Sequence, residues 1–380
     1  MTIGRQIPGV QTEMDDLAGY VALALAPGIG PVRLGALLDA CGSPDGALSA
    51  PFARLGAVPG FSRAAVTGVR SARREHGEKV LRRTEALGGF VLTPFDSLFP
   101  RTLREIPDAP ALLFLSGRRE HLERPAVAIV GSRDHSAYGS TVCRLVATRA
   151  AEAGIVVVSG MARGLDAVAH EAALDAGGAS IGVLGNGLGI VYPSANRALY
   201  ERMRAHGLLL TEFGPGERPN AGSFSRRNRL ISGLARVTVV IEAAAGSGTM
   251  ITVNSALEQG REVMAVPGAI TSAVSVGTNR LIRDGASPLL EPDDLLAFYP
   301  EAIVTRPARP FATGNTASAP LPADLTPDER TLAELIGPEP LHLDALAARS
   351  ERPMAAVLAT LSALEVRGVV RQDPGRIFRR

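Results

Sequence analysis

The stretch of sequence that decides the fold is Val127-Ala128-Ile129-Val130-Gly131-Ser132-Arg133. An uninterrupted apolar run with two valines and an isoleucine is typical of a strand buried on both faces. The glycine and serine after it permit a sharp turn, and a helix is expected near residues 137–151. Such a strand, turn and helix often bind anions, because the start of the helix offers unpaired N–H donors. Arg133 adds a guanidinium suited to phosphate.

Further apolar runs follow, separated by segments of helical length. They span residues 155–160, 181–185, 208–212, 237–242 and 263–268. Strands that alternate with helices predict an α/β fold with a doubly wound, mostly parallel sheet, whose ligands bind at the carboxyl ends of the strands. Two shorter runs, 88–93 and 111–115, are expected to add strands at one edge of the sheet.

Length and composition limit the class of protein. The chain has 380 residues, enough for two or three domains, and a net charge of only +2. It lacks the roughly 18 consecutive apolar residues of a transmembrane helix, and residues 1–16 do not resemble a signal peptide. Cys41 and Cys143 are expected to be buried, reduced thiols. A cytoplasmic protein without a membrane partner is therefore expected.

The chain divides into four predicted parts. Residues 1–87 form a helical domain, 88–300 the α/β domain, 301–323 a proline- and alanine-rich linker, and 324–380 a compact C-terminal domain. In this last domain apolar residues recur at helical spacing over three segments, and a hairpin is expected around Asp373-Pro374-Gly375. Three helices and a hairpin indicate a winged helix, which serves either for protein contacts or for DNA binding. Its arginines favour an acidic partner.

The helical domain contains two similar turns, Ala26-Pro27-Gly28-Ile29-Gly30 and Val58-Pro59-Gly60-Phe61-Ser62. The first fits a helix–hairpin–helix pattern, which can offer N–H groups to a DNA phosphate, whereas the second lacks the closing glycine. A turn inside a packed bundle explains both equally well. Residues 63–83, expected on a helix, carry seven basic and two acidic side chains. This segment is either a solvated helix face or a surface for nucleic acid.

The usual enzyme motifs are missing. The sequence has no Walker phosphate loop, no His-Glu-x-x-His and no Cys-x-x-Cys, and its six histidines show no metal-ligand spacing. Glycine-rich turns do follow several strands, at 185–189 and 246–249. Together they indicate one anion-binding crevice. A nicotinamide dehydrogenase is disfavoured, because the first strand ends in Gly131-Ser132-Arg133 and the second in Ser159-Gly160.

The most unusual segment lies between residues 218 and 236, with five arginines and no acidic residue. Within it, Phe224-Ser225-Arg226-Arg227-Asn228-Arg229 combines guanidinium groups with an aromatic ring, as suits single-stranded nucleic acid. The alternative is that Phe224 packs in the core and that the arginines pair with Glu212 and Glu242. Ligand contact is favoured for Phe224 and Arg226, while both roles stay open for Asn228 and Arg229.

These segments resemble the DNA-processing protein A family (DprA, also called Smf). The resemblance covers most of the chain and rests on seven motifs in the order of the family. They are Val130–Arg133, Ser159–Asp166 with Ala169-His170, Tyr192-Pro193, Phe224–Leu234, Gly246–Thr249, Ala265–Gly268 and Gly277–Ile282. Each motif alone is weak, but seven in order are specific.

The resemblance implies an extended Rossmann-like core that forms a homodimer and binds single-stranded DNA. It also implies an N-terminal domain like a sterile alpha motif. Such proteins protect incoming DNA and load RecA recombinase during natural transformation, without known catalysis, cofactor or metal. The family pocket uses the positions of Arg133 and Phe224. Two departures are Ser225, where relatives carry proline, and the absence of pocket lysines, for which arginines such as Arg163 or Arg226 are expected to substitute.

The predicted DNA-binding residues come from the glycine turns and the arginine segment. They are Gly131, Ser132, Arg133, Ser159, Gly160, Arg163, Gly164, Phe224, Arg226, Arg227, Asn228, Arg229, Gly246, Ser247, Gly248 and Thr249. The enzymatic alternative is a phosphoribohydrolase of the lysine-decarboxylase-like (LOG) type, but Thr252 stands where that class has its catalytic glutamate. A scaffold that recruits recombinase without touching DNA is a further alternative.

Overall fold

The structure is a computed structural model, and it describes residues 16–303 and parts of the C-terminal region. Those parts are residues 322, 325–336, 341–350, 352–367, 369–373 and 377–379. The chain separates into two compact units, Met1–Thr305 and Arg306–Arg380. The first 15 residues of the predicted helical domain and most of the predicted linker lie outside the described residues. The four predicted domain boundaries stay predictions.

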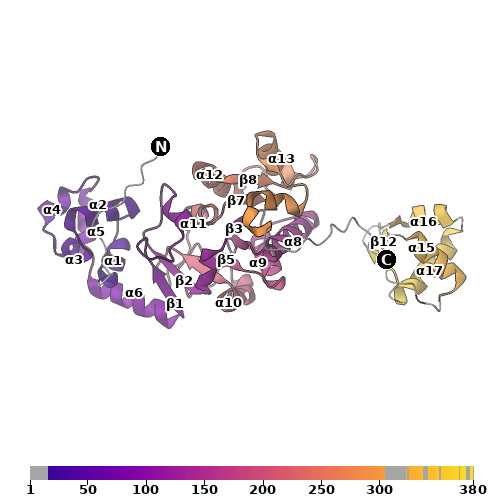
Figure 1. The fold of residues 1–380 in the computed structure, drawn as a ribbon, viewed down its shortest axis with the longest axis horizontal. Helices are drawn as coiled ribbons and strands as arrows, with labels where there is room; N and C mark the ends of the chain where they lie inside the picture. Colours follow the sequence, from indigo (N-terminus) through magenta and orange to yellow (C-terminus); the bar gives the residue numbers. More distant parts are fainter. Residues whose placement is uncertain are drawn as a thin grey trace. The chain divides into compact units, whose positions relative to one another are not determined.

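A nine-stranded sheet organises the first unit (Figure 1), in the order β1-β2-β6-β5-β4-β3-β7-β8-β9. Strand β2 pairs antiparallel with both β1 and β6, and the other neighbouring strands pair in parallel. The strands are β1 (Gly89–Leu92), β2 (Leu113–Gly117), β3 (Ala126–Val130), β4 (Val156–Ser159), β5 (Ser180–Val183), β6 (Leu208–Thr211), β7 (Val237–Val240), β8 (Glu262–Ala265) and β9 (Ser287–Pro288). The predicted α/β fold is therefore confirmed, with β9 as a short addition at one edge.

The central strand β3 shows why the sheet is buried on both faces. Ala128 and Val130 belong to one apolar cluster, whereas Val127 and Ile129 belong to another. The first face is covered by α7 (Arg101–Arg104), α11 (Ala221–Leu234), α12 (Thr249–Glu258) and α13 (Val276–Arg283). The second is covered by α8 (Ala137–Glu152), α9 (Leu165–Asp175) and the 3₁₀ segment η4 (Pro292–Phe298).

A bundle of short helices precedes the sheet. It contains α1 (Leu17–Ala24), α2 (Pro31–Cys41), α3 (Pro44–Ser49), α4 (Phe52–Gly56), α5 (Arg63–Ser71) and α6 (Arg74–Ala86). The single helix expected over residues 63–83 is wrong, because the chain extends at Ala72 and Arg73 and divides it into two helices. The bundle and the sheet share one apolar cluster with α10 (Arg197–His206). The hydroxyl of Tyr20 also donates to the carbonyl of Ala111, at 2.8 Å.

The second unit is a winged helix, as predicted. Its helices are α15 (Pro327–Leu335), α16 (Leu343–Ser350) and α17 (Met354–Val366). Its three strands, β10 (Leu341–His342), β12 (Ile377–Arg379) and β11 (Arg371–Asp373), pair in that order. Leu332, Leu346, Leu361 and Phe378 are among the residues of its core. The tip of the predicted hairpin, residues 374–376, lies outside the described residues.

Three smaller expectations can be compared with the described residues. Cys143 is fully buried, but Cys41 is only half-buried, and neither forms a disulfide. No helix in this part of the chain has the length and apolarity to cross a membrane. The same residues contain no cluster of histidine, cysteine and carboxylate side chains that could hold a metal ion.

Candidate functional site

The carboxyl ends of the central strands meet at one rim of the sheet. From β3 the chain builds outward through β4, β5 and β6 on one side, and then continues with β7, β8 and β9 on the other. Such a reversal of strand order leaves a crevice between the loops that follow β3 and β7. Two adjoining pockets occupy this rim, and Arg133, Ala162, Phe224 and Arg227 line both of them.

The larger pocket has a volume of about 390 Å³. One wall comes from the turn after β3, a second from α11, and a third from the start of α12. The predicted site residues among its lining are Gly131, Arg133, Phe224, Arg227, Asn228, Ser247, Gly248 and Thr249. The glycine-turn motifs that are far apart in sequence therefore meet on one surface.

The smaller pocket is aromatic on one side. The rings of Phe224 and Tyr192 lie 5.4 Å apart between centroids, at an interplanar angle of 38°. Tyr192 is 49% exposed, and Phe224 is half-buried. Gly185 is required opposite, because a Cβ there would approach the ring of Phe224 to 2.7 Å. This geometry leaves two aromatic faces beside an open pocket, which suits the stacking of an unpaired base.

Arg133 is the cation best placed for a ligand. Its side chain is exposed, and in the described part of the chain it forms no ion pair. Arg163 lines the smaller pocket with a side chain 59% exposed, and its nearest acid, Asp134, lies 3.8 Å away. Both arginines therefore keep donors available for a phosphate group.

Arg227 is a buried cation beneath the same pockets. It is 4% exposed and donates to the carbonyls of Gly160, which follows β4, and of Val183, which ends β5. Burial lowers the pKa of Arg227 to about 10, and the positive charge of Arg133 acts in the same direction. Asp166 opposes this shift, and burial raises the pKa of its carboxyl group in turn. Arg227 stays charged at neutral pH and adds positive potential to the floor of the crevice.

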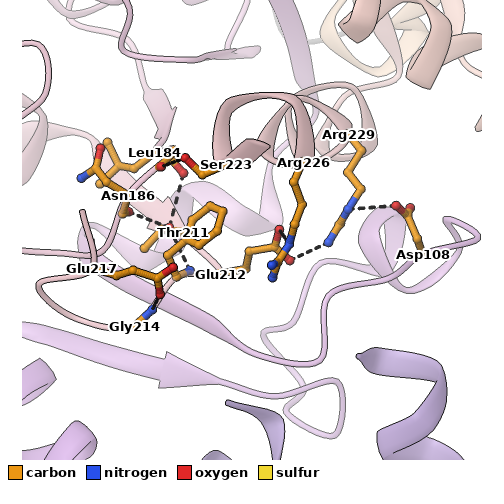
Figure 2. Close-up of polar contacts among 12 residues, drawn as sticks. Asp108, Leu184, Asn186, Thr211, Glu212, Gly214, Glu217, Ser223, Arg226 and Arg229 are labelled. Atoms are coloured by element: carbon orange, nitrogen blue, oxygen red, sulfur yellow. Dashed lines mark hydrogen bonds and ion pairs between the residues drawn. The ribbon is translucent and has the colours of Figure 1, made fainter. Parts of the chain in front are cut away.

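Arg226 and Arg229 face the other side of α11 (Figure 2), where both pair with Glu212. Arg229 is 9% exposed and also reaches Asp108, at 2.9 Å. Arg226 lies over the ring of Phe213 at 4.9 Å, with 58% of its side chain exposed. Neither arginine lines the two rim pockets. The alternative given in the sequence analysis, pairing with Glu212, is therefore what the structure shows for both, including Arg226, for which ligand contact was favoured. Glu242, in contrast, pairs with neither arginine.

The start of α8 differs from the expectation of an open anion site. The buried carboxylate of Glu242 accepts a hydrogen bond from the N–H of Ser136, at 2.9 Å, and another from its hydroxyl. Ser136 itself caps the helix by accepting from the N–H of Gly139, at 3.0 Å. A protein carboxylate thus takes the place expected for an anion, and the prediction for this helix start is wrong.

The N-terminus that faces the larger pocket is instead that of α12. Gly248 precedes the helix without a side-chain cap, and Ser247 and Thr249 link their hydroxyl groups at 3.0 Å. The N–H of Thr249 also donates to the Ser247 hydroxyl, at 3.2 Å. Exposed backbone, two hydroxyl groups and the helix dipole together favour an anionic group at this wall.

Several predicted residues support the site without lining it. Ser159 is fully buried and donates to the carbonyl of Ile129, at 2.7 Å. Ser132 hydrogen-bonds within its own turn, to Asp134. Gly164 has φ +81° and leaves no room for a Cβ against the backbone of Arg133. Gly246, also with positive φ, turns the loop into α12.

Sequence reasoning missed two residues of the smaller pocket, Met161 and Tyr192, and a third residue, Asn196, that holds its wall. Met161 is buried with φ +57°, a strained conformation for a residue with a side chain. The side-chain amide of Asn196 donates to the carbonyls of Met161 and Ala162, both at 3.0 Å, and so holds this turn. Tyr192 belonged to a quoted motif but had no assigned role. Its position before a proline gave no signal that it would face Phe224.

A buried histidine behind the rim gives a test of the core. His170 is fully buried, and its Nδ1 lies 2.7 Å from the Ser180 hydroxyl. Burial, and then the charge of Arg227, lower the pKa of His170 from 6.5 to about 3. Below pH 6.5 the imidazole of His170 is therefore protonated in the unfolded chain but stays neutral in the folded chain. The free energy of unfolding consequently falls as the pH drops.

We predict that this histidine removes about 2 kcal/mol of unfolding free energy between pH 7 and pH 5. Urea unfolding of wild type and of His170→Gln at both pH values measures the effect. The variant is expected to start from lower stability at pH 7 but to lose about 2 kcal/mol less on acidification. Equal losses in the two proteins would show that His170 accepts a proton in the folded state.

Family comparisons match both units of the chain. The family model described as DNA recombination-mediator protein A matches residues 90–300, and the DprA winged helix domain matches residues 316–376. Protein Smf of Synechocystis sp. is 32% identical over 391 aligned positions, which cover 96% of this chain and 98% of that protein. The matched regions contain the whole rim described above and most of the winged helix.

Two solved structures share the fold. The crystal structure of DNA processing protein A from Streptococcus pneumoniae has a TM-score of 0.66 at 35% identity, covering 73% of this chain and 97% of that one. A structure of DNA processing protein A from Helicobacter pylori, described for its single-stranded DNA binding mode, has a TM-score of 0.52 at 28% identity. It covers 56% of this chain and 96% of that one.

Proposed function

The chain belongs to the DNA recombination-mediator protein A (DprA/Smf) family, and from this premise we propose that it binds single-stranded DNA along the rim crevice. The observation that carries the proposal is the aromatic pair Phe224 and Tyr192 beside Arg133, which forms no ion pair among the described residues. The relative from Helicobacter pylori, whose structure concerns single-stranded DNA binding, supports it. Duplex DNA offers no free base face, because its bases are already stacked.

In this proposal the crevice binds DNA through two kinds of contact, which are charged contacts to phosphates and aromatic stacking on a base. Arg133, Arg163 and the start of α12 hold phosphates of the backbone, while the buried Arg227 adds positive potential from below. Phe224 and Tyr192 accept one base between or beside their rings. Arg226 and Arg229 are not included in this crevice, because Glu212 engages both on the other side of α11.

The finer role is proposed from the family. The protein would protect incoming single strands in the cytoplasm and load RecA recombinase onto them during natural transformation. It would act as a homodimer through the Rossmann-like domain and without catalysis. The enzymatic alternative is weaker, because Thr252, 2% exposed, lines the larger pocket where a phosphoribohydrolase of the LOG type would need a glutamate.

The proposal is tested with fluorescence anisotropy of a labelled oligo-dT and of a matching duplex at two salt concentrations. Wild type is expected to prefer the single strand. Phe224→Ala is expected to weaken oligo-dT binding about tenfold, because it removes one base-stacking surface. Its salt dependence should stay that of wild type, since no charge is lost.

Phe224→Tyr is the matched control, because it keeps an aromatic face at the same position. It is expected to retain most of the affinity for oligo-dT. Equal, strongly salt-dependent binding of single strand and duplex by wild type would reduce the crevice to a charge patch and overturn the stacking role. Failure to bind either DNA at low salt would favour a scaffold that acts through protein contacts alone.

A further inference from the structure

The two turns of the helical domain are equivalent parts of an internal repeat. The segment from α1 through α2 matches the segment from α4 through α5 when residue numbers are shifted by 32, as from Gly28 to Gly60. Both glycines have φ +78°. In the first turn the N–H of Ile29 donates to Ala26, and in the second that of Phe61 donates to Val58, both at 3.1 Å.

The missing glycine of the second turn does not break the repeat. Gly30 precedes α2 with φ −104° and ψ 177°, an extended conformation open to any residue. Ser62 precedes α5 with φ −88° and ψ 165°, and its hydroxyl caps that helix through the N–H of Ala65. Serine therefore replaces glycine without strain and adds a cap. The chain carries two complete helix–hairpin–helix units.

The two hairpins lie side by side in an approximately two-fold arrangement. The guanidinium of Arg33 donates to the carbonyl of Gly28 at 2.8 Å and to that of Gly60 at 2.9 Å. In return, Gly28 packs against Ala65, which is the residue equivalent to Arg33 in the second unit. Each hairpin thus contacts the first turn of the helix that follows the other hairpin.

The hairpins present free donors and positive charge. In the described part of the chain, the N–H groups of Gly28, Gly30, Gly60 and Ser62 donate no hydrogen bond, and all four residues are exposed. Residues 17–86 carry nine basic and five acidic side chains. Exposed backbone donors with this excess of positive charge suit the phosphates of a nucleic acid.

A pocket beside the first hairpin adds an independent sign of a ligand. It has a volume of about 300 Å³ and is lined by Ile29, Gly30 and Pro31 together with Arg226 and Arg229 of α11. Arg229 is 9% exposed, and its Nη1 has no hydrogen-bond partner among the described residues. Arg226 keeps 58% of its side chain exposed. The first hairpin and two guanidinium groups therefore share one cleft, whose lining also contains their acidic partner Glu212.

We infer that this double hairpin, with Arg226 at its edge, binds the sugar–phosphate backbone of duplex DNA next to the single-strand crevice. The antiparallel strands of a duplex are related by two-fold axes, so a two-fold pair of phosphate sites matches the two strands. Because α11 carries Phe224 on one side and Arg226 on another, the two sites are separated by about one helix diameter. This inference rests on the proposed function. It implies that the protein binds DNA in which a duplex adjoins a single strand.

The test compares oligo-dT, a blunt duplex and the same duplex with an oligo-dT tail, using the full chain and fluorescence anisotropy. Gly30→Asp with Ser62→Asp places a negative charge at each hairpin while keeping a good helix cap. A Cβ at Gly30 meets no atom within 4 Å, so the substitution fits. Wild type is expected to bind the tailed duplex about tenfold more tightly than oligo-dT, and the Asp variant to lose this gain.

The control is Gly30→Asn with Ser62→Asn, which keeps the shape and the caps but adds no charge. It should bind all three DNAs as wild type does, and the Asp variant should keep the wild-type affinity for oligo-dT. A tailed duplex bound no better than oligo-dT by wild type would overturn the inference, as would equal losses for both DNAs in the Asp variant. If oligo-dT alone is not bound, the proposed function fails, and loss of blunt-duplex binding in the Asp variant still supports the hairpins.

Discussion

Arg133→Ala is expected to weaken oligo-dT binding by roughly 1–3 kcal/mol, which is about a factor of 5 to 150. Arg133 lines both rim pockets, is exposed, and lacks an ion-pair partner in the described part of the chain. Within the described residues its charge is therefore not compensated by an acid, and a phosphate would bind it strongly. The salt dependence of binding should also fall, by about one unit of slope or less.

A matched control is available at the opposite end of the sheet. Arg101 has a side chain 88% exposed and lines a pocket beside the start of β3, away from the crevice. Arg101→Ala removes the same charge and should leave oligo-dT affinity nearly unchanged at moderate salt. If both variants lose the same affinity, binding depends on net charge alone. An unchanged affinity in Arg133→Ala would remove this residue from the site.

The strands could be predicted because their signal is local. Each central strand is an apolar run flanked by turn residues, and burial on both faces of a parallel sheet demands such a run. The two-residue β9 has no such run, since Ser287 and Pro288 carry no strand signal. The break between α5 and α6 was also invisible, because Ala72 and Arg73 are residues that a helix accepts.

The side chains of the site were harder to predict because their partners are distant in sequence. Glu242 caps the start of α8 through Ser136, 106 residues earlier. Nothing near residue 136 indicates that a carboxylate will occupy this helix start. The choice between ligand contact and ion pairing for Arg226 and Arg229 likewise depended on where α11 would lie over Glu212. The order of the motifs was enough to predict the site at the rim. Which arginines face it depends on tertiary packing that the sequence does not show.

Glu212→Gln is expected to lower the free energy of unfolding of the first unit by about 3 kcal/mol. The Glu212 side chain is 5% exposed, and its oxygens pair with Arg226 at 2.8 Å and with Arg229 at 2.5 Å (Figure 2). The substitution keeps the shape but removes the charge. Among the described residues, Arg229, whose side chain is 11% exposed, then keeps Asp108 as its one acidic partner. Urea unfolding followed by far-ultraviolet circular dichroism measures the loss.

The loss of unfolding free energy should come from the buried guanidinium of Arg229, which no longer has Glu212 as a partner. Two further variants separate this cause from others. Asp108→Asn removes an acid whose side chain is 60% exposed, so it should change stability by less than about 1 kcal/mol. Glu212→Gln combined with Arg229→Met removes both buried charges and should recover much of the loss, because no buried cation is left unpaired. Measuring Arg229→Met alone completes the comparison. A double variant as unstable as the sum of Glu212→Gln and Arg229→Met would show that shape, not charge, fixes α11 beside Glu212.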